Sequence, residues 1–258
     1  MVFVARVRIA SIVTRRPLPS LPEIRRPLLR RLLAEGRLLR AIECHDPLSA
    51  LLGESARVDQ RGVSIEFDVL WASGFSHATS LGLPDAELSS LERRLDCIAN
   101  IAAATCKPIL ADVDTGGDAL ALGYLCRRLE TLGISGAVVE DKTGAKRTSL
   151  ASGVAHALEE PRAFVRKLTQ AREHLQTKDF LLFARIESLI AGRGLEDALM
   201  RAQYYLRASA DGVVIHSKDG SGQEIVAFMK GYRTLQNEIG IAKPLVCIPR
   251  KRMSTARR

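Results

Sequence analysis

From residue 41 onward, short apolar runs alternate with longer amphipathic stretches along the chain. The runs are rich in β-branched residues and predict strands at 41–43, 67–71, 108–111, 136–139, 180–184, 212–215 and 244–248. The stretches repeat apolar residues at helical spacing and predict helices over 86–105, 118–132, 161–175, 194–209 and 222–236. Apolar strands that alternate with helices indicate a parallel sheet covered on both faces. Seven such strands favour a (β/α) barrel of the TIM-barrel type, in the α/β class, over a three-layer sandwich. No GxGxxG turn or P-loop follows any of them.

Net charge changes this picture only at the two ends of the chain. The 258 residues include 38 Lys and Arg against 29 Asp and Glu, a net charge of +9. Residues 1–40 hold ten Arg and two Glu, and residues 243–258 hold six basic residues and no acidic one. The stretch 41–242 therefore carries 22 basic and 27 acidic residues, a net charge of −5. Because the body is mildly acidic, a nucleic-acid partner is not expected despite the overall charge.

The cysteines and the terminal segments point to a cytoplasmic protein. Five widely spaced cysteines form no CxxC or Cys/His pattern, so reduced thiols are expected and not a zinc site or a disulfide framework. No apolar run approaches the roughly 18 residues that span a bilayer, so no membrane association is expected. The Arg-rich N-terminus has the composition of a mitochondrial presequence. Prolines at 17, 19 and 22 interrupt a long amphipathic helix, which favours a loose basic extension instead.

Polar and charged groups follow five of the predicted strands, at the point where each strand ends. These segments are 71–74, 112–117, 140–142, 185–187 and 216–218. In a barrel the carboxyl ends of all strands converge on one face, where the active sites of this fold are built. A single acidic pair after a strand is usually a solvated loop, but five such strand ends favour one shared site.

Three carboxylates among these strand ends have the chemistry of a site for a hard metal ion. Asp112 and Asp114 lie two residues apart, so both can point into the barrel mouth, and Glu140 enters from the next strand. Three carboxylates repel one another unless a cation neutralises them. Oxygen ligands without His or Cys select Mg²⁺, with Mn²⁺ as the alternative.

Positive charge and hydrogen-bond donors accompany the carboxylates. Arg185, His216, Lys142 and Lys146 would surround the ion and bind a small substrate that carries carboxylate and phosphoryl groups. The structural alternative makes Arg185 and Glu187 a barrel ion pair and His216 an ordinary interior histidine.

Two further segments have a predicted role in binding. No GxSxG motif is present, so Ser73, which precedes Gly74, is interpreted as a donor to an oxyanion and not as a nucleophile. The polar, Gly-containing segment 143–153 follows the fourth strand and is predicted to be a lid that closes over a phosphoryl group. A plain surface loop is the alternative for this segment.

Seven motifs in combination resemble the phosphoenolpyruvate mutase/isocitrate lyase superfamily, within it the branch of phosphoenolpyruvate mutase and phosphonopyruvate hydrolase. The resemblance covers about residues 37–249. Its motifs lie at 43–50, 70–76, 81–85, 109–117, 140–149, 184–194 and 210–218. It implies a (β/α)8 barrel with Mg²⁺ at the strand ends. It also implies a homo-oligomer, a dimer or tetramer, in which subunits exchange the eighth helix.

The resemblance also implies roles for individual residues. Asp112 matches the direct metal ligand, and the carboxylates that hold the metal's waters match Asp85, Asp114 and Glu140. The residues that receive the pyruvyl end of the substrate match Ser73 and Gly74, and the neighbouring Trp71 and Phe75 join the predicted substrate-binding set. Arg185 and His216 match the groups that bind the anionic ends, and Lys146 and Thr148 fall on the gating loop; these four are the predicted catalytic residues, with Arg185 and Thr148 also contacting substrate.

One departure bears on the choice between the two activities of the branch. The mutase pattern has Asn-Ser after the gating lysine, whereas this chain has Thr148-Ser149, as in the hydrolase. The insertion at about 54–66 and the framing of the 140–150 segment resemble a mutase subgroup from phosphonate pathways. The prediction is therefore a Mg²⁺-dependent isomerase of phosphonate biosynthesis that interconverts phosphoenolpyruvate and phosphonopyruvate. Phosphonopyruvate hydrolase, releasing pyruvate and phosphate, is the alternative.

The predicted domain organisation is a partly disordered basic N-terminal extension over 1–36, a catalytic barrel over 37–249 and a basic tail over 250–258. The barrel is expected to be truncated after strand seven, because a strand eight and the exchanged helix have no counterpart. A non-catalytic truncated homologue is therefore a further alternative. A C–C lyase or an oxaloacetate hydrolase is disfavoured, because segment 143–150 lacks the cysteine typical of the lyase loop.

Overall fold

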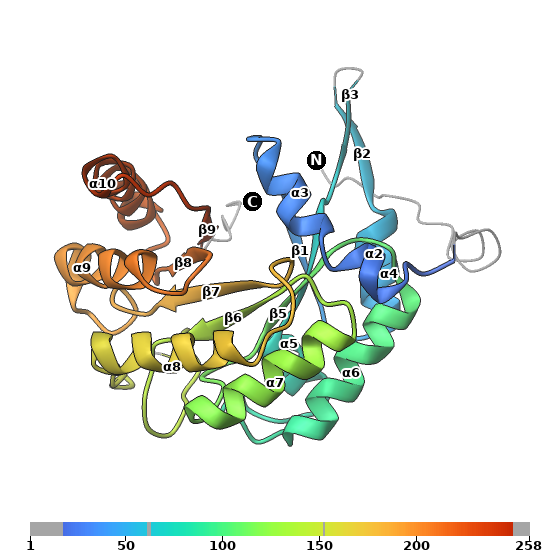
Figure 1. Ribbon diagram of the computed structural model, residues 1–258, viewed down its shortest axis with the longest axis horizontal. Helices are drawn as coiled ribbons and strands as arrows, with labels where there is room; N and C mark the ends of the chain where they lie inside the picture. Colours follow the sequence, from blue (N-terminus) through green and yellow to red (C-terminus); the bar gives the residue numbers. More distant parts are fainter. Residues whose placement is uncertain (1–17, 61–62, 152, 250–258) are drawn as a thin grey trace, which may run out of the picture. The chain divides into compact units, whose positions relative to one another are not determined.

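The computed structural model describes residues 18–60, 63–151 and 153–249, and its helices, strands and compact units consist of these residues. The predictions for the extreme termini, 1–17 and 250–258, lie outside them. Seven strands hydrogen-bond in the order β1-β4-β5-β6-β7-β8-β9, and β2 and β3 form a separate two-stranded sheet (Figure 1). The fold is therefore α/β with a seven-stranded parallel sheet, as the alternation of apolar runs predicts.

The observed strands coincide with the seven predicted runs, apart from the hairpin formed by β2 and β3. Their bounds are β1 Ala41–Cys44, β2 Arg57–Gln60, β3 Val63–Glu66, β4 Val69–Ala72, β5 Ile109–Asp112, β6 Gly136–Glu140, β7 Leu181–Ile186, β8 Gly212–His216 and β9 Leu245–Ile248. The helices are α2 Pro22–Arg25, α3 Leu28–Ala34, α4 Pro47–Ser55, α5 Gly74–Ser80, α6 Leu91–Ala104, α7 Ala119–Thr131, α8 Pro161–Glu173, α9 Gly194–Arg207 and α10 Gln223–Ile239.

The chain divides into two compact units. The first contains the residues up to 84 together with 88–112 and 128–136. In it β4 pairs in parallel with β1 on one side and with β5 on the other. Leu70 of β4, Ile98 of α6 and Ile109 of β5 are fully buried. Arg25 of α2 is also buried and donates to the carbonyls of Ala102 and Thr105, so this part of the predicted N-terminal extension packs within the first unit.

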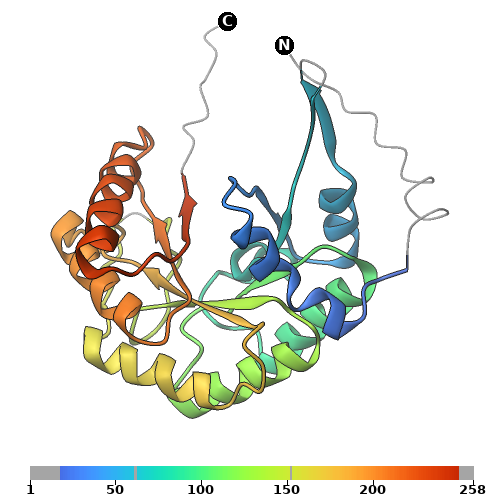
Figure 2. The same ribbon diagram turned by 45° about the horizontal axis from the view of Figure 1, so that its top comes forward.

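The second unit contains residues 85–87, 113–127 and 137 onward. Here β8 pairs in parallel with both β7 and β9. Every residue of β6, β7 and β8 is buried, as expected for strands covered on both faces, whereas all four residues of β9 are half-buried. Helices α9 and α10 pack against each other (Figure 2).

Several helices begin at capping residues that can be recognised in the sequence. Asp46 caps α4 and forms a reciprocal capping box with Ser49, with Pro47 in the first turn. Glu160 caps α8 with its side chain, which accepts from the backbone N–H of Ala163. Among the described residues, no helix combines the length and the apolarity needed to cross a bilayer. All five cysteines lie in this part of the chain and are free thiols; Cys44 and Cys126 are buried.

Candidate active site

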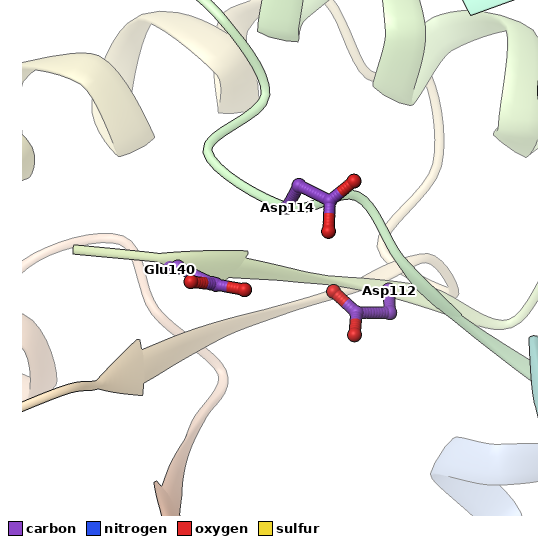
Figure 3. A group of neighbouring side chains, drawn as sticks. All are labelled: Asp112, Asp114 and Glu140. Atoms are coloured by element: carbon purple, nitrogen blue, oxygen red, sulfur yellow. The ribbon is translucent and has the colours of Figure 1, made fainter. Parts of the chain in front are cut away.

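Three carboxylates lie together at the ends of two neighbouring strands. Asp112 ends β5, Glu140 ends β6, and Asp114 stands in the loop that follows β5. One oxygen of each lies within 4.8 Å of an oxygen of the others (Figure 3). Asp112 and Glu140 are buried, and Asp114 is partly exposed. The structure therefore brings together three of the four carboxylates predicted to hold a metal.

The backbone around Asp114 explains how the loop presents its carboxylate. Asp114 has a φ of +55°, a left-handed conformation that Asp adopts more readily than most residues. The glycines at 116 and 117 also have positive φ, of 71° and 72°. The Asp114 carbonyl accepts a 2.8 Å hydrogen bond from the Glu140 N–H, which ties the loop to the end of β6.

Lys146 connects the fourth predicted metal carboxylate, Asp85, to this cluster. Its ammonium nitrogen donates to Asp85 Oδ1 at 2.6 Å and also to Asp114 Oδ1, and it lies 3.8 Å from Glu140 Oε1. The Lys146 side chain is only 3% exposed, so its charge is balanced by carboxylates and not by water. The segment predicted as a lid thus places a cation among the acidic residues.

Glu140 is surrounded by further cations. Lys142 Nζ lies 2.8 Å from Glu140 Oε2, and Arg185 Nη1 lies 3.5 Å from Glu140 Oε1. Burial alone would raise the pKa of this carboxyl group, but Arg185, Lys142 and Lys146 outweigh burial and lower the pKa to about 2. Glu140 is consequently ionised throughout the physiological range.

Glu187 was predicted only as an ion-pair partner of Arg185, but it joins several groups of the site. Its Oε1 lies 2.6 Å from Arg185 Nε, and its Oε2 lies 3.1 Å from Lys142 Nζ. Ser149 donates to Oε2 at 2.7 Å and itself accepts from Lys142 at 2.5 Å. Glu187 is fully buried, so it holds the cationic side chains in fixed positions.

Arg185 and His216, both predicted catalytic residues, contact each other. Arg185 Nη2 lies 3.1 Å from His216 Nδ1 and donates to Ser149 Oγ at 3.2 Å. A guanidinium has no lone pair to offer, so Nδ1 accepts and the imidazole proton is on Nε2. Burial, followed by the charge of Arg185, lowers the pKa of His216 to about 4. His216 is therefore a neutral imidazole at pH 7.

The remaining predicted residue of the gating segment is Thr148. It is half-buried, and its carbonyl accepts from the Ala151 N–H.

Farther along, His156 Nε2 lies 3.4 Å from Lys218 Nζ. Desolvation, with Lys142 and Lys218, lowers the pKa of His156, which favours its neutral form beside Lys218.

The predicted residues for the pyruvyl end lie in the first unit, where β4 ends. Ser73 is buried and is the N-cap of α5, which begins at Gly74. Its side-chain oxygen accepts a hydrogen bond from the Ser76 N–H. Trp71 is half-buried, whereas Phe75 is 44% exposed.

Arg94 of helix α6, which sequence reasoning missed, organises the ends of β4 and β5. Its guanidinium donates to the carbonyls of Ser73, Ala72 and Asp112 at 2.8, 2.7 and 2.9 Å. The helical pattern predicts α6, but an arginine within it gives no indication that its partners are strand carbonyls.

The donor set of the carboxylate cluster fits a hard divalent cation. Asp112, Asp114 and Glu140 offer only oxygen ligands, which suit Mg²⁺ or Mn²⁺. The ammonium group of Lys146 already lies against two of these carboxylates, which demonstrates that the surroundings accommodate a positive charge.

Comparison with known proteins identifies the class to which this fold and site belong. Residues 29–257 match the family model described as phosphoenolpyruvate phosphomutase. The chain is 38% identical over 205 residues to a phosphonopyruvate hydrolase from Variovorax sp., covering 79% of this chain and 68% of the relative. It is 34% identical over 209 residues to a phosphoenolpyruvate phosphomutase from Tetrahymena pyriformis, covering 81% and 64% of the two chains. The chain thus spans about two thirds of the length of these relatives.

Solved structures agree with this assignment. A phosphoenolpyruvate phosphomutase from Streptomyces platensis subsp. rosaceus superimposes with a TM-score of 0.79 at 33% identity, over 89% of this chain and 74% of the other. A phosphonopyruvate hydrolase in complex with oxalate and Mg²⁺ gives a TM-score of 0.74 at 35% identity, over 87% and 71%. The protein belongs to the phosphoenolpyruvate phosphomutase family, and the resemblance derived from its motifs is confirmed.

Proposed function

We propose that this protein is a Mg²⁺-dependent phosphoenolpyruvate mutase that interconverts phosphoenolpyruvate and phosphonopyruvate, the C–P bond-forming step of phosphonate biosynthesis. The observation that carries the proposal is the cluster of Asp112, Asp114 and Glu140 beside the buried pair of Arg185 and His216. Carboxylates that can hold a cation lie next to groups that can bind an anion. A substrate with both carboxylate and phosphoryl groups matches such a site.

A divalent ion bound by the carboxylates would supply Lewis-acid charge stabilisation at the pyruvyl oxygens. Asp112 is proposed as its direct ligand, with Asp85, Asp114 and Glu140 holding the ion's waters. Ser73 and Gly74 are proposed to receive the pyruvyl end of the substrate.

Transfer of the phosphoryl group requires positioning and neutralisation of its charge more than covalent chemistry. The Arg185 guanidinium is the proposed phosphoryl ligand, and Glu187 holds it in orientation through the 2.6 Å contact to Nε. Neutral His216 donates through Nε2–H, because its Nδ1 faces Arg185. These donors are aligned before substrate arrives, so little reorganisation accompanies the transfer.

The gating segment would decide whether the phosphoryl group returns to carbon or passes to water. Lys146 and Ser149 fasten this segment to two carboxylates, the partly buried Asp85 and the fully buried Glu187. A closed segment excludes water and favours isomerisation, whereas an admitted water molecule yields pyruvate and phosphate. Thr148 would contact the phosphoryl group from this segment.

Phosphonopyruvate hydrolase is the second candidate. Thr148 stands where the mutase pattern has asparagine, and the 38% identity to a hydrolase exceeds the 34% identity to a mutase. A hydroxyl is shorter than an amide and leaves more room for water beside the phosphoryl group.

A ³¹P NMR time course with phosphonopyruvate and Mg²⁺ tests the two candidates. A phosphoenolpyruvate signal supports the mutase, a phosphate signal supports the hydrolase, and an unchanged substrate contradicts both. We expect Asp112→Ala to abolish conversion, and full activity in this variant would contradict the metal assignment. Exposed Glu173 at the end of α8 provides the control, because Glu173→Ala leaves every proposed site residue in place.

A further inference from the structure

Two non-glycine residues with positive φ lie in neighbouring segments of the second unit. Among the described residues only Glu87, at φ 54°, and Asp114, at φ 55°, adopt this conformation without being glycine. Such a backbone is unfavourable for a residue with a side chain and persists only where the surroundings impose it. The contacts that hold these two residues are therefore informative.

Thr115, the residue after Asp114, is held by two charged side chains. Glu87 Oε1 accepts hydrogen bonds from the Thr115 N–H at 2.9 Å and from its hydroxyl at 2.7 Å. Lys167 of α8 donates to the Thr115 carbonyl at 2.6 Å. Thr115 and Lys167 are both buried. The N–H, O–H and C=O groups of a single residue are thus all bonded to ionisable side chains.

The same two segments are joined a second time through the carboxylate cluster. Glu87 lies two residues after Asp85, and the Lys146 ammonium bonds to both Asp85 and Asp114. Segment 85–87 is therefore connected to segment 114–115 at both of its ends. Both left-handed residues, Glu87 and Asp114, thus lie in segments that these contacts hold together.

We propose that Glu87, together with Lys167, is a positioning residue that clamps Thr115 and thereby fixes the Asp114 carboxylate for binding of the divalent cation. The inference deepens the proposed function and depends on its metal assignment. Lys167 faces Glu159 at 3.9 Å, so its charge remains compensated while it bonds to the Thr115 carbonyl. Glu87 itself does not reach the cation, and it acts through the backbone of residue 115. Partners of this kind orient metal ligands, and their loss typically weakens metal affinity without removing a ligand.

The test measures Mn²⁺ binding by electron paramagnetic resonance on the full chain without substrate. Glu87→Ala is expected to raise the Mn²⁺ dissociation constant about tenfold or more, the usual effect of losing a group that orients a ligand. Thr115→Val should raise it less, because the backbone N–H can still donate to Glu87. The matched control Glu173→Ala should bind Mn²⁺ as the wild type does.

Hydrogen–deuterium exchange of the metal-free protein gives a second, independent measurement. Glu87→Ala should accelerate exchange over residues 113–117, and Glu87→Gln, which retains an acceptor oxygen, should restore part of both protection and Mn²⁺ affinity. Faster exchange with unchanged Mn²⁺ affinity would mean that the contacts are merely structural and would overturn the inference.

The outcomes separate this inference from the proposed function. Normal Mn²⁺ affinity in Glu87→Ala overturns the clamp and leaves the proposed function intact. Weakened affinity in that variant, with no conversion of phosphonopyruvate by the wild type, supports the clamp and contradicts the proposed function. A wild-type protein that binds no Mn²⁺ overturns both.

Discussion

Glu140 and Asp141 are adjacent in the chain, yet their carboxylates enter two separate buried networks. The network of Glu140 consists of the cations Lys142, Lys146 and Arg185. One of these cations comes from the gating segment and another contacts His216, so this network includes groups expected to meet substrate and metal. Its charges hold the pKa of Glu140 at about 2, against the opposing effect of burial.

The network of Asp141 is anchored in helix α9. Arg201 Nη1 lies 3.0 Å from Asp141 Oδ2, and the Tyr205 hydroxyl donates to the same oxygen at 2.7 Å. The Glu187 N–H donates to the other oxygen at 2.9 Å. Burial raises the pKa of Asp141 to about 6, although Arg201 and Tyr205 act in the opposite direction.

The difference arises because successive residues at a strand end point to opposite sides. On the side of Glu140 lie cationic side chains that can bind a ligand. On the other side, the hydrogen bonds of Asp141 join the ends of β6 and β7 to α9. We therefore expect changes around Glu140 to reduce activity and changes around Asp141 to reduce stability.

The largest effect is expected for Glu140→Gln. Loss of a carboxylate from the proposed cation site should lower kcat/KM by more than about 1,000-fold, because metal charge stabilisation is worth several kcal/mol. Steady-state kinetics at varied Mg²⁺ measures this loss, and thermal unfolding verifies that the variant is folded. Asp141→Asn should retain far more activity. An equal decrease of kcat/KM in Glu140→Gln and Asp141→Asn would contradict the functional distinction between the two networks.

The next effect concerns Arg201. Arg201→Met leaves the buried Asp141 carboxylate without its counter-ion and should lower the free energy of unfolding by about 3–5 kcal/mol. Urea denaturation followed by circular dichroism measures this. In the double variant with Asp141→Asn no buried charge remains unpaired, so most of the lost stability should return. If the double variant instead loses the sum of the two single-variant decreases in unfolding free energy, the ion pair is not the source of the effect.

A smaller effect is expected from pH through His216. The folded protein holds its pKa at about 4, against 6.5 in the unfolded chain, so the unfolded state binds more protons between these values. Stability from this group is complete above pH 6.5 and is lost as the pH falls toward 4, by about 3 kcal/mol in total. Urea denaturation at pH 7 and pH 4.5 should show a smaller decrease for His216→Asn than for the wild type. The same decrease in both would assign the pH dependence to other groups.

The strands and the grouping of Asp112, Asp114 and Glu140 were predictable because both follow from simple rules. Buried parallel strands require continuous apolar runs, and the polar residues that end them, such as Asp112 and Glu140, fall at the same edge of the sheet. The hairpin of β2 and β3 was not predicted as such, since β2 and β3 are largely exposed and carry no continuous apolar run.

The supporting contacts of the site were beyond prediction from the sequence. Nothing in the spacing of Glu87 and Thr115 indicates that they bond. Their contact depends on a left-handed backbone at Glu87 and at Asp114, the residue before Thr115, and this backbone is set by tertiary contacts. Lys167 lies on a helix whose pattern predicts only amphipathicity, and its hydrogen bond to the Thr115 carbonyl has no local signal. Residue types predicted the chemistry of the site, and the packing of distant segments determined its geometry.

The three hydrogen bonds of Arg94 also determine the alignment of a helix with two strands. One residue of slippage along α6 would move the guanidinium by about 1.5 Å, several times the spread of hydrogen-bond lengths. All three bonds would then be lost together, because the guanidinium is planar and rigid. Arg94 therefore favours one register of α6 against β4 and β5, and one arginine side chain ties Ser73, directly after β4, to Asp112, at the end of β5.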